Sequence, residues 1–245
     1  MSKPVVKVDT YKEAATTSGA SEDNSYAGMR IHALPGLHQF IAETAKHFIP
    51  PGAAVLDIGA GSGAMSARLM DSGYKVSSVD IVKENFRLID KVPFFKADLN
   101  TNFAQEIGKN FDGLFAVEII EHLENPRHFL RQCYELLNPG GHLVLSTPNI
   151  GSPGSQAFFI RSGYFQWFSD TDYVKQGHLT PISMVELIRM AEEANFKIEL
   201  KNSFGDSMSY FKRWPKMRIL AKICDFVSTV PMDMRGELLV MVLKK

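Results

Sequence analysis

The sequence predicts an α/β fold, in which a mostly parallel β-sheet carries helices on both of its faces. Short apolar runs alternate with segments of helical periodicity through the middle of the chain, a pattern typical of parallel sheets. A length of 245 residues suits one domain with insertions better than two independent domains, since domains average ~150 residues. We therefore expect one domain at residues 31–245, after a polar arm at residues 1–30 that is mobile or folds over a bound ligand.

The predicted elements alternate in a regular order. A first helix at residues 34–48 has apolar side chains at helical spacing and stops at the Pro-Pro-Gly sequence of residues 50–52. A second helix reaches Ser72, and a later one begins at Ser183, which forms a capping-box pattern with Glu186. Strands are expected at residues 53–58, 75–79, 92–96, 111–117, 142–146, 196–200 and 238–243.

Two segments depart from this alternation. Residues from about 150 to 180 hold many aromatic side chains broken by glycine and serine, and we expect a lid or insertion there. Residues from about 208 to 230 contain a basic amphipathic stretch, in which Lys and Arg residues between Lys212 and Lys222 interleave with apolar ones. Such a stretch can lie on an anionic membrane or bind a phosphorylated substrate, but a solvated helix packed over the sheet is the favoured interpretation.

The composition excludes several classes of protein. Lys and Arg together number 27, as do Asp and Glu, so no net charge attracts a polyanion and nucleic acid is not an expected partner. Cys133 and Cys224 belong to no Cys-x-x-Cys motif, which argues against zinc-finger and thioredoxin-type sites and favours a reducing compartment. Without a long uncharged apolar run or an apolar leader, we expect a cytoplasmic protein, at most peripheral on a membrane.

The strongest functional signal is a buried strand that runs into a glycine-rich turn, residues 56–63, which read Leu-Asp-Ile-Gly-Ala-Gly-Ser-Gly. Glycines let the backbone approach a ligand closely, and the N–H groups at the start of the following helix can face it. Asp57 is placed to hold an ammonium group, and Asp80, at the end of the next strand, to accept both hydroxyls of a ribose. With Ala64 the turn also satisfies a dinucleotide-binding pattern.

These motifs resemble those of the class I S-adenosylmethionine-dependent methyltransferases over about residues 34–245. Residues 56–63 are similar to the first motif of that family, and Asp80 matches its ribose-binding acidic residue. The Ala-Asp-Leu sequence at 97–99 matches the position of its adenine contact, and residues 137–141 resemble the turn before its fifth strand. The resemblance implies a three-layer Rossmann-like fold with seven strands, the last of them antiparallel, and S-adenosylmethionine as the methyl donor.

The resemblance also implies a set of cofactor-binding residues. They surround the carboxyl ends of the first strands of the sheet, where ligands bind in open α/β folds. The set comprises Asp57, Gly59, Ala60, Gly61, Gly63, Asp80, Ile81, Asp98, Leu99, Val117 and Glu118.

Three potential metal ligands follow the strand at 111–117. Glu118, Glu121 and His122 have the spacing i, i+3, i+4, so in a helix their side chains would share one face and could bind one Mg²⁺ or Zn²⁺. The spacing is similar to that of metal-assisted O-methyltransferases of ubiquinone biosynthesis and of small-RNA 2′-O-methyltransferases. In metal-free relatives such side chains cap or brace the next helix, and the sequence leaves both interpretations open, with the structural one favoured.

His178 lies between the aromatic insertion and the next predicted helix. It can act as a general base on an acceptor hydroxyl, serve as a further metal ligand, or bond its own loop. We expect an S-adenosylmethionine-dependent O-methyltransferase in which His178, Glu121 and His122 have catalytic roles. The Asn/Asp-Pro-Pro-aromatic sequence of amino-group methyltransferases that act on DNA bases is absent, which favours oxygen as the acceptor atom. Residues 146–149 and 177–181 resemble segments of enzymes of bacterial glycan and secondary-metabolite pathways, and this resemblance implies a sugar, a lipid-linked intermediate or a phenolic small molecule as the acceptor.

Three alternatives to this function remain. The glycine pattern allows an NAD(P)-dependent oxidoreductase, although the sequence has no Tyr-x-x-x-Lys pair. A non-catalytic binding module would keep the cofactor pocket and methylate nothing. An RNA 2′-O-methyltransferase would need the basic stretch at residues 212–222 to bind RNA, and the neutral overall charge counts against it. The sequence does not indicate an oligomeric state.

Overall fold

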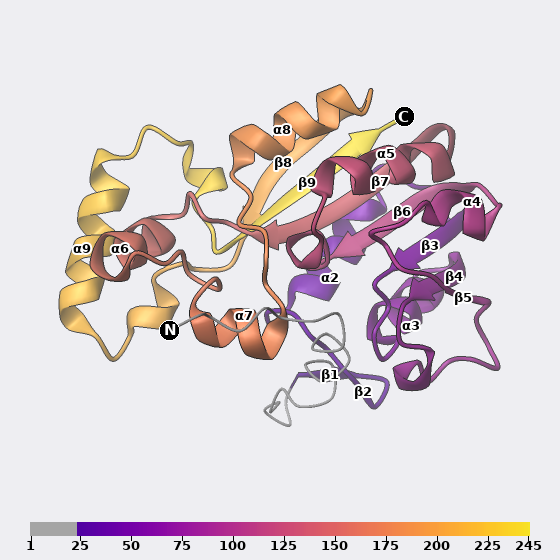
Figure 1. Ribbon diagram of the computed structural model, residues 1–245, viewed down its shortest axis with the longest axis horizontal. Helices are drawn as coiled ribbons and strands as arrows, with labels where there is room; N and C mark the ends of the chain where they lie inside the picture. Colours follow the sequence, from indigo (N-terminus) through magenta and orange to yellow (C-terminus); the bar gives the residue numbers. More distant parts are fainter. Residues whose placement is uncertain (1–23) are drawn as a thin grey trace, which may run out of the picture.

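Seven strands form one sheet in the order β5-β4-β3-β6-β7-β9-β8 in the computed structural model, which describes residues 24–245 (Figure 1). Strands β3 to β7 are mutually parallel, whereas β9 lies antiparallel between β7 and β8. The predicted α/β fold with an antiparallel last strand is therefore confirmed. The strands are β3 (Ala54–Ile58), β4 (Lys75–Asp80), β5 (Phe94–Lys96), β6 (Phe111–Val117), β7 (Leu137–Pro148), β8 (Lys197–Phe204) and β9 (Leu238–Lys244).

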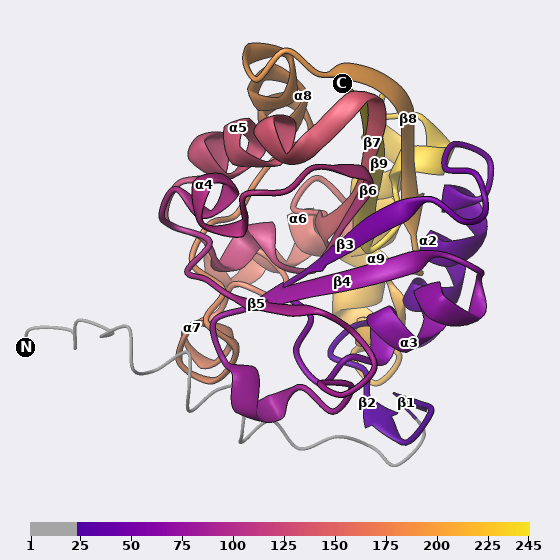
Figure 2. The same ribbon diagram turned by 90° about the vertical axis from the view of Figure 1, so that its right-hand side faces the viewer.

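Helices cover both faces of the sheet (Figure 2). On one face lie α2 (Leu37–Ala45) and α3 (Ala64–Asp71); on the other lie α4 (Phe103–Ile107), α5 (Pro126–Leu136) and α8 (Met184–Glu193). Successive side chains of a strand point to opposite faces, so Leu114 enters the α5 side of the core while Phe115 enters the α2 side. The central strands are buried on both faces and read as continuous apolar runs for this reason.

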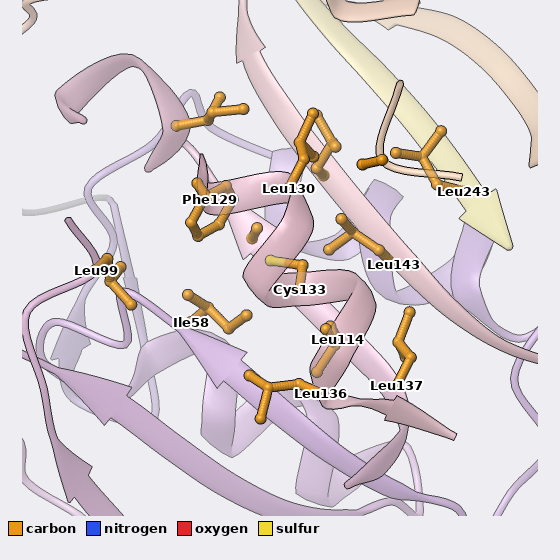
Figure 3. Close-up of a cluster of buried hydrophobic side chains, with 14 of the residues drawn as sticks. Ile58, Leu99, Leu114, Phe129, Leu130, Cys133, Leu136, Leu137, Leu143 and Leu243 are labelled. Carbon is orange, nitrogen blue, oxygen red and sulfur yellow. The ribbon is translucent and has the colours of Figure 1, made fainter. Parts of the chain in front are cut away.

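Helix α5 shows how the sequence specifies one of these layers. The side chain of Asn125 accepts a hydrogen bond from the His128 N–H, and Pro126 occupies the first turn, so the helix starts there. Its apolar face packs onto the sheet, as Figure 3 shows for Phe129, Leu130, Cys133 and Leu136. Burying each such large apolar side chain stabilises the fold by about 1.5–3 kcal/mol. Burial also raises the pKa of the Cys133 thiol, which suits a packing role.

Two insertions form a lobe beyond the end of β7 (Figure 1). The first, between β7 and α8, contains α6 (Pro153–Ser162) and α7 (Asp170–Gln176); the second, between β8 and β9, contains α9 (Pro215–Val227). The main partner of α9 is α6, through a small buried cluster that includes Ala157, Phe211, Met217 and Ala221. The prediction that the basic stretch packs over the sheet is therefore wrong.

A short hairpin precedes the sheet. Strands β1 (Ser25–Tyr26) and β2 (Met29–Arg30) pack against α3, where the Tyr26 hydroxyl donates to Asp71 at 2.6 Å. The Ser62 hydroxyl of the glycine turn donates to the Arg30 carbonyl at 2.7 Å, which ties the hairpin to that turn. Of the predicted arm, residues 1–23 lie outside the described residues. Strands of two residues show no periodicity, so the sequence did not reveal the hairpin.

The described part of the chain also contains four short 3₁₀ turns, η1 (Lys83–Asn85), η2 (Ile120–His122), η3 (Ser209–Phe211) and η4 (Met232–Met234). No helix within residues 24–245 combines the length and the hydrophobicity that a membrane span requires.

Candidate active site

The glycine turn joins β3 to α3 at the carboxyl edge of the sheet. Gly59, Gly61 and Gly63 have φ angles of 75°, 51° and 94°, a left-handed region that favours glycine. A Cβ atom at Gly59 would lie 2.7 Å from the side chain of Ile119, so this position also needs glycine for space. The N–H groups of Gly59, Ala60, Gly61 and Gly63 are engaged inside the protein. The turn therefore lets a ligand approach the backbone closely. These four N–H groups, however, already donate within the protein.

Asp57 lies beneath this turn, on β3, and is 2% exposed. The Ser66 hydroxyl of α3 donates to it at 2.5 Å. Burial raises the pKa of the Asp57 carboxyl to about 7. An ammonium group nearby would favour the charged form, so the role of Asp57 stays a prediction that requires a cation beside it.

Asp80 ends β4 and contacts the glycine turn directly. Its two carboxylate oxygens accept from the Gly61 N–H and the Val82 N–H, each at 2.8 Å. A carboxylate oxygen has two lone pairs, so both oxygens keep capacity for a ribose hydroxyl. Burial raises the pKa of Asp80. Hydrogen bonds from three backbone N–H groups offset part of that increase.

The other predicted cofactor residues lie along the same edge of the sheet. Ile81 follows β4, Val117 ends β6, and Asp98 and Leu99 follow β5. Asp98 accepts from the Asn100 N–H at 2.9 Å, which fixes the loop after β5, and Leu99 is buried. Adjacent parallel strands end at one edge, so these residues lie at the same edge of the sheet as the glycine turn, and their contact with a cofactor stays a prediction.

Glu118 does not lie in a helix. Its φ of 52° is left-handed, and the 3₁₀ turn η2 begins only at Ile120. The stretch is not helical, so Glu118, Glu121 and His122 do not share a helical face. Its carboxylate instead accepts from the Ser146 hydroxyl at 2.7 Å, and burial raises its pKa to about 7.

Three side chains converge near the end of β7. The potential ligand atoms of Glu121, His122 and His178 all lie within 4.8 Å of one another, and Glu118 is outside this group. Nε2 of His122 lies 3.9 Å from Oε1 of Glu121. We call Glu121, His122 and His178 the carboxylate–imidazole cluster. The structure thus brings together two of the three predicted ligands with the histidine predicted from a distant segment.

Backbone contacts orient both imidazoles of this cluster. Nδ1 of His122 lies 3.2 Å from the Gly177 carbonyl, and Nδ1 of His178 lies 2.7 Å from the Trp167 carbonyl. A carbonyl only accepts, so these contacts favour the tautomer with the proton on Nδ1 and a lone pair on Nε2. Burial lowers the pKa of His178, and burial together with the neighbouring His178 lowers that of His122 to about 3. Both rings are therefore neutral near pH 7.

Glu121 is fully buried in this cluster. The Thr147 hydroxyl donates to Oε2 at 3.1 Å, whereas Oε1 has no hydrogen-bond partner among the described residues. Burial, and then the negative charge of Glu118, raises the pKa of Glu121 well above its ordinary value. A carboxylate oxygen without a hydrogen-bond partner among the described residues and two neutral imidazoles are a donor set that fits a divalent cation.

The structure adds residues that the sequence did not single out. Glu237, just before β9, is buried and accepts from the Trp167 indole N–H at 3.1 Å and the Gln166 amide at 3.2 Å. Burial raises its pKa to about 7, and its charge contributes to the raised pKa of Glu118. A single glutamate before a strand belongs to no motif, so only the fold reveals it. The side chain of Asn149, just after β7, is buried and donates to the Met234 and Gly236 carbonyls.

Comparisons with known proteins assign the chain to a family. The sequence matches the methyltransferase domain family over residues 26–201. A ubiquinone biosynthesis O-methyltransferase from Cereibacter sphaeroides (strain ATCC 17025 / ATH 2.4.3) is 31% identical over 148 residues, which are 57% of this chain and 60% of that one. The chain spans 44% to 60% of the length of the curated relatives that it matches.

Solved structures share the fold at low sequence identity. A SAM-dependent methyltransferase from Archaeoglobus fulgidus has a TM-score of 0.60 and 18% identity, covering 85% of this chain and 94% of its own. The 1,6-didemethyltoxoflavin-N1-methyltransferase of Burkholderia thailandensis, solved with S-adenosylhomocysteine, has a TM-score of 0.54 and 18% identity, covering 85% of this chain and 77% of its own. The chain therefore belongs to the methyltransferase domain family and has the fold of the class I S-adenosylmethionine-dependent methyltransferases.

Proposed function

We propose that this protein transfers the methyl group of S-adenosylmethionine to a hydroxyl oxygen of a small molecule, a sugar or a lipid-linked intermediate. The carboxylate–imidazole cluster is the observation that carries the proposal, because it sets two neutral, oriented imidazoles beside a buried carboxylate. Such groups suit removal of a proton from a hydroxyl. The O-methyltransferase relatives support oxygen as the acceptor atom.

The donor would lie at the carboxyl edge of the sheet. The glycine turn lets the backbone approach it, Asp80 would accept its ribose hydroxyls, and Asp57 would attract its ammonium group. Asp98 would meet the adenine amino group, as the family resemblance implies. The apolar side chains of Ile81, Leu99 and Val117 would line the adenine ring.

Methyl transfer is an in-line displacement at the sulfonium methyl, so catalysis depends on holding the acceptor oxygen close and deprotonated. Nε2 of His178 can take that proton, since its ring is neutral and its Nδ1–H is fixed on the Trp167 carbonyl. Alternatively, Glu121, His122 and His178 would hold Mg²⁺ or Zn²⁺. When bound, such a cation lowers the pKa of an acceptor hydroxyl.

These two routes exclude one another at His178. One Nε2 lone pair can accept a proton or bind a cation, but not both at once. A His178 that acts as base predicts activity that survives a chelator. A His178 that acts as ligand predicts activity that a chelator abolishes.

Calorimetric titration of the full chain with S-adenosylhomocysteine, beside NADH, tests the donor. We expect S-adenosylhomocysteine to bind and NADH not to bind. The reverse result would overturn the proposal. Transfer of labelled methyl from S-adenosylmethionine to phenolic, sugar and lipid-linked acceptors, with a chelator or with added Mg²⁺ or Zn²⁺, then tests the acceptor. Turnover with an RNA acceptor alone would favour the 2′-O-methyltransferase alternative, and donor binding without any turnover would favour a non-catalytic module.

A further inference from the structure

Helix α9 exposes an apolar stripe on its outer side. Ile219, Ile223 and Phe226 follow the spacing i, i+4, i+7 and are 61%, 54% and 89% exposed. The opposite side of the helix, with Met217 and Ala221, is buried against the lobe. Single exposed apolar residues are ordinary, but a continuous stripe marks a contact surface.

Basic side chains flank this stripe. Lys216 and Lys222 lie on either side of Ile219 on the helical wheel, and Lys212, Arg213 and Arg218 lie close by in the sequence. None of these five forms an ion pair within residues 24–245. The acidic residue of the helix, Asp225, is paired with Arg235 at 2.9 Å. The surface around the stripe is therefore positively charged, and no ion pair neutralises its lysines and arginines within the described residues.

Arg235 also fixes the carboxyl end of α9. Its guanidinium donates to the Asp225, Ser228 and Val230 carbonyls at 2.7–2.9 Å. These bonds hold the chain on both sides of Phe226 before any partner binds. The exposed phenyl ring consequently sits on a fixed backbone, which lowers the entropy lost on docking.

We propose that α9 docks on the surface of an anionic lipid bilayer. At 13 residues the helix is too short to cross a bilayer, but it can lie in the interface with its apolar stripe among the acyl chains. The flanking lysines would then meet the lipid phosphates. Trp214 and Tyr210, 54% and 50% exposed beside the start of the helix, have the amphipathic rings that favour such an interface. This docking is independent of the reaction proposed above.

Sedimentation of the full chain with lipid vesicles tests the proposal. We expect binding to phosphatidylcholine vesicles that contain phosphatidylglycerol, little binding to phosphatidylcholine alone, and weaker binding as NaCl rises. The double variant Lys216→Glu/Lys222→Glu should weaken partitioning by roughly fivefold or more per lysine. Ile223→Ser/Phe226→Ser should weaken it at every salt concentration, because the apolar contribution is not screened.

Matched controls lie on other parts of the surface. Val185→Ser removes an exposed apolar side chain from α8, and Lys75→Glu reverses an exposed charge at the start of β4. Both should bind vesicles as the wild type does. Absence of binding to phosphatidylglycerol vesicles, or equal loss in the controls, would overturn the proposal. So would a dimer that Phe226→Ser dissociates without changing vesicle binding, or salt-dependent RNA binding without any lipid binding.

Discussion

The imidazole rings of His122 and His178 meet edge to face, with their centroids 4.8 Å apart and their planes at 79°. The two residues come from η2 and from the loop after α7, so the contact joins the sheet to the first insertion. Each ring is held by a different backbone carbonyl, and their free nitrogens converge toward Glu121. The aromatic insertion therefore completes the candidate active site.

Zn²⁺ should stabilise the protein through this cluster. A ligand that binds only the folded state at 100 times its Kd adds about 2.7 kcal/mol to the free energy of unfolding. Thermal unfolding with and without Zn²⁺ measures the effect, which His178→Ala should remove. His47→Ala, an exposed histidine on the other side of the sheet's core, should keep it. An unchanged Tm of the wild type with both Zn²⁺ and Mg²⁺ would contradict the metal route.

Loss of the base would reduce turnover without weakening donor binding. If His178 takes the acceptor proton, His178→Ala should lower kcat/KM by about 10²–10⁴-fold. Its affinity for S-adenosylhomocysteine should stay the same. The pKa of His178 lies below its ordinary value, so wild-type activity should fall only when the pH drops below that lowered pKa. A variant with full activity would show that His178 only stabilises its loop.

Asp80→Asn should weaken donor binding by ~1–3 kcal/mol. The amide keeps one acceptor oxygen but cannot serve the Gly61 and Val82 N–H groups together with the ribose hydroxyls. Calorimetry with S-adenosylhomocysteine measures the loss, and urea unfolding checks that the variant stays folded. Unaltered affinity would remove Asp80 from the donor site.

Gly59→Ala should disturb the turn more than Gly52→Ala does. Both positions have a left-handed φ, 75° and 80°, which costs an alanine roughly 1–2 kcal/mol. Space around the new Cβ is open at Gly52, whereas at Gly59 it meets Ile119. Urea unfolding should therefore show the larger loss for Gly59→Ala, and only that variant should bind S-adenosylhomocysteine less tightly. Equal effects of the two substitutions would mean that backbone strain alone matters.

Glu237 should make stability depend on pH. Burial raises its pKa from 4.5 to about 7, so the folded protein binds this proton more tightly than the unfolded chain. The stabilising contribution is complete below about pH 4.5 and is lost as the pH rises toward 7, by up to about 1.4 kcal/mol per pH unit. Urea unfolding at both ends of this range should show a shallower decline for Glu237→Gln, which keeps an acceptor for Trp167. Parallel declines in the two proteins would contradict the raised pKa.

The fold was predictable from the sequence because each buried strand is a short apolar run bounded by turns. The predicted strand at residues 111–117 coincides with β6, and the one at 238–243 differs from β9 by a single residue. A parallel sheet buried on both faces imposes this pattern locally, so no long-range information is needed. The same locality explains the placement of Asp57 and Asp80 at one edge.

The cluster was only partly predictable because it depends on tertiary contacts. The i, i+3, i+4 spacing would bring Glu118 to the other two residues only in a helix, but the backbone there is left-handed and the Glu118 carboxylate accepts from Ser146. His178 reaches the cluster because the N–H groups of Leu179 and Thr180 donate hydrogen bonds to the Glu121 carbonyl. Helix α9 was misplaced for a related reason, since its amphipathic pattern fits a sheet or another helix equally well.

Because β9 runs antiparallel to β8, the second insertion begins and ends at neighbouring points of the sheet. Phe204, at the end of β8, is the register partner of Leu238, at the start of β9, so the chain leaves and rejoins the sheet at neighbouring points. A connection of this kind can lengthen, shorten or be exchanged without shifting strand register, as loop tips on other scaffolds do. The second insertion, which carries α9, can therefore vary in length while the register of β8 against β9 stays the same.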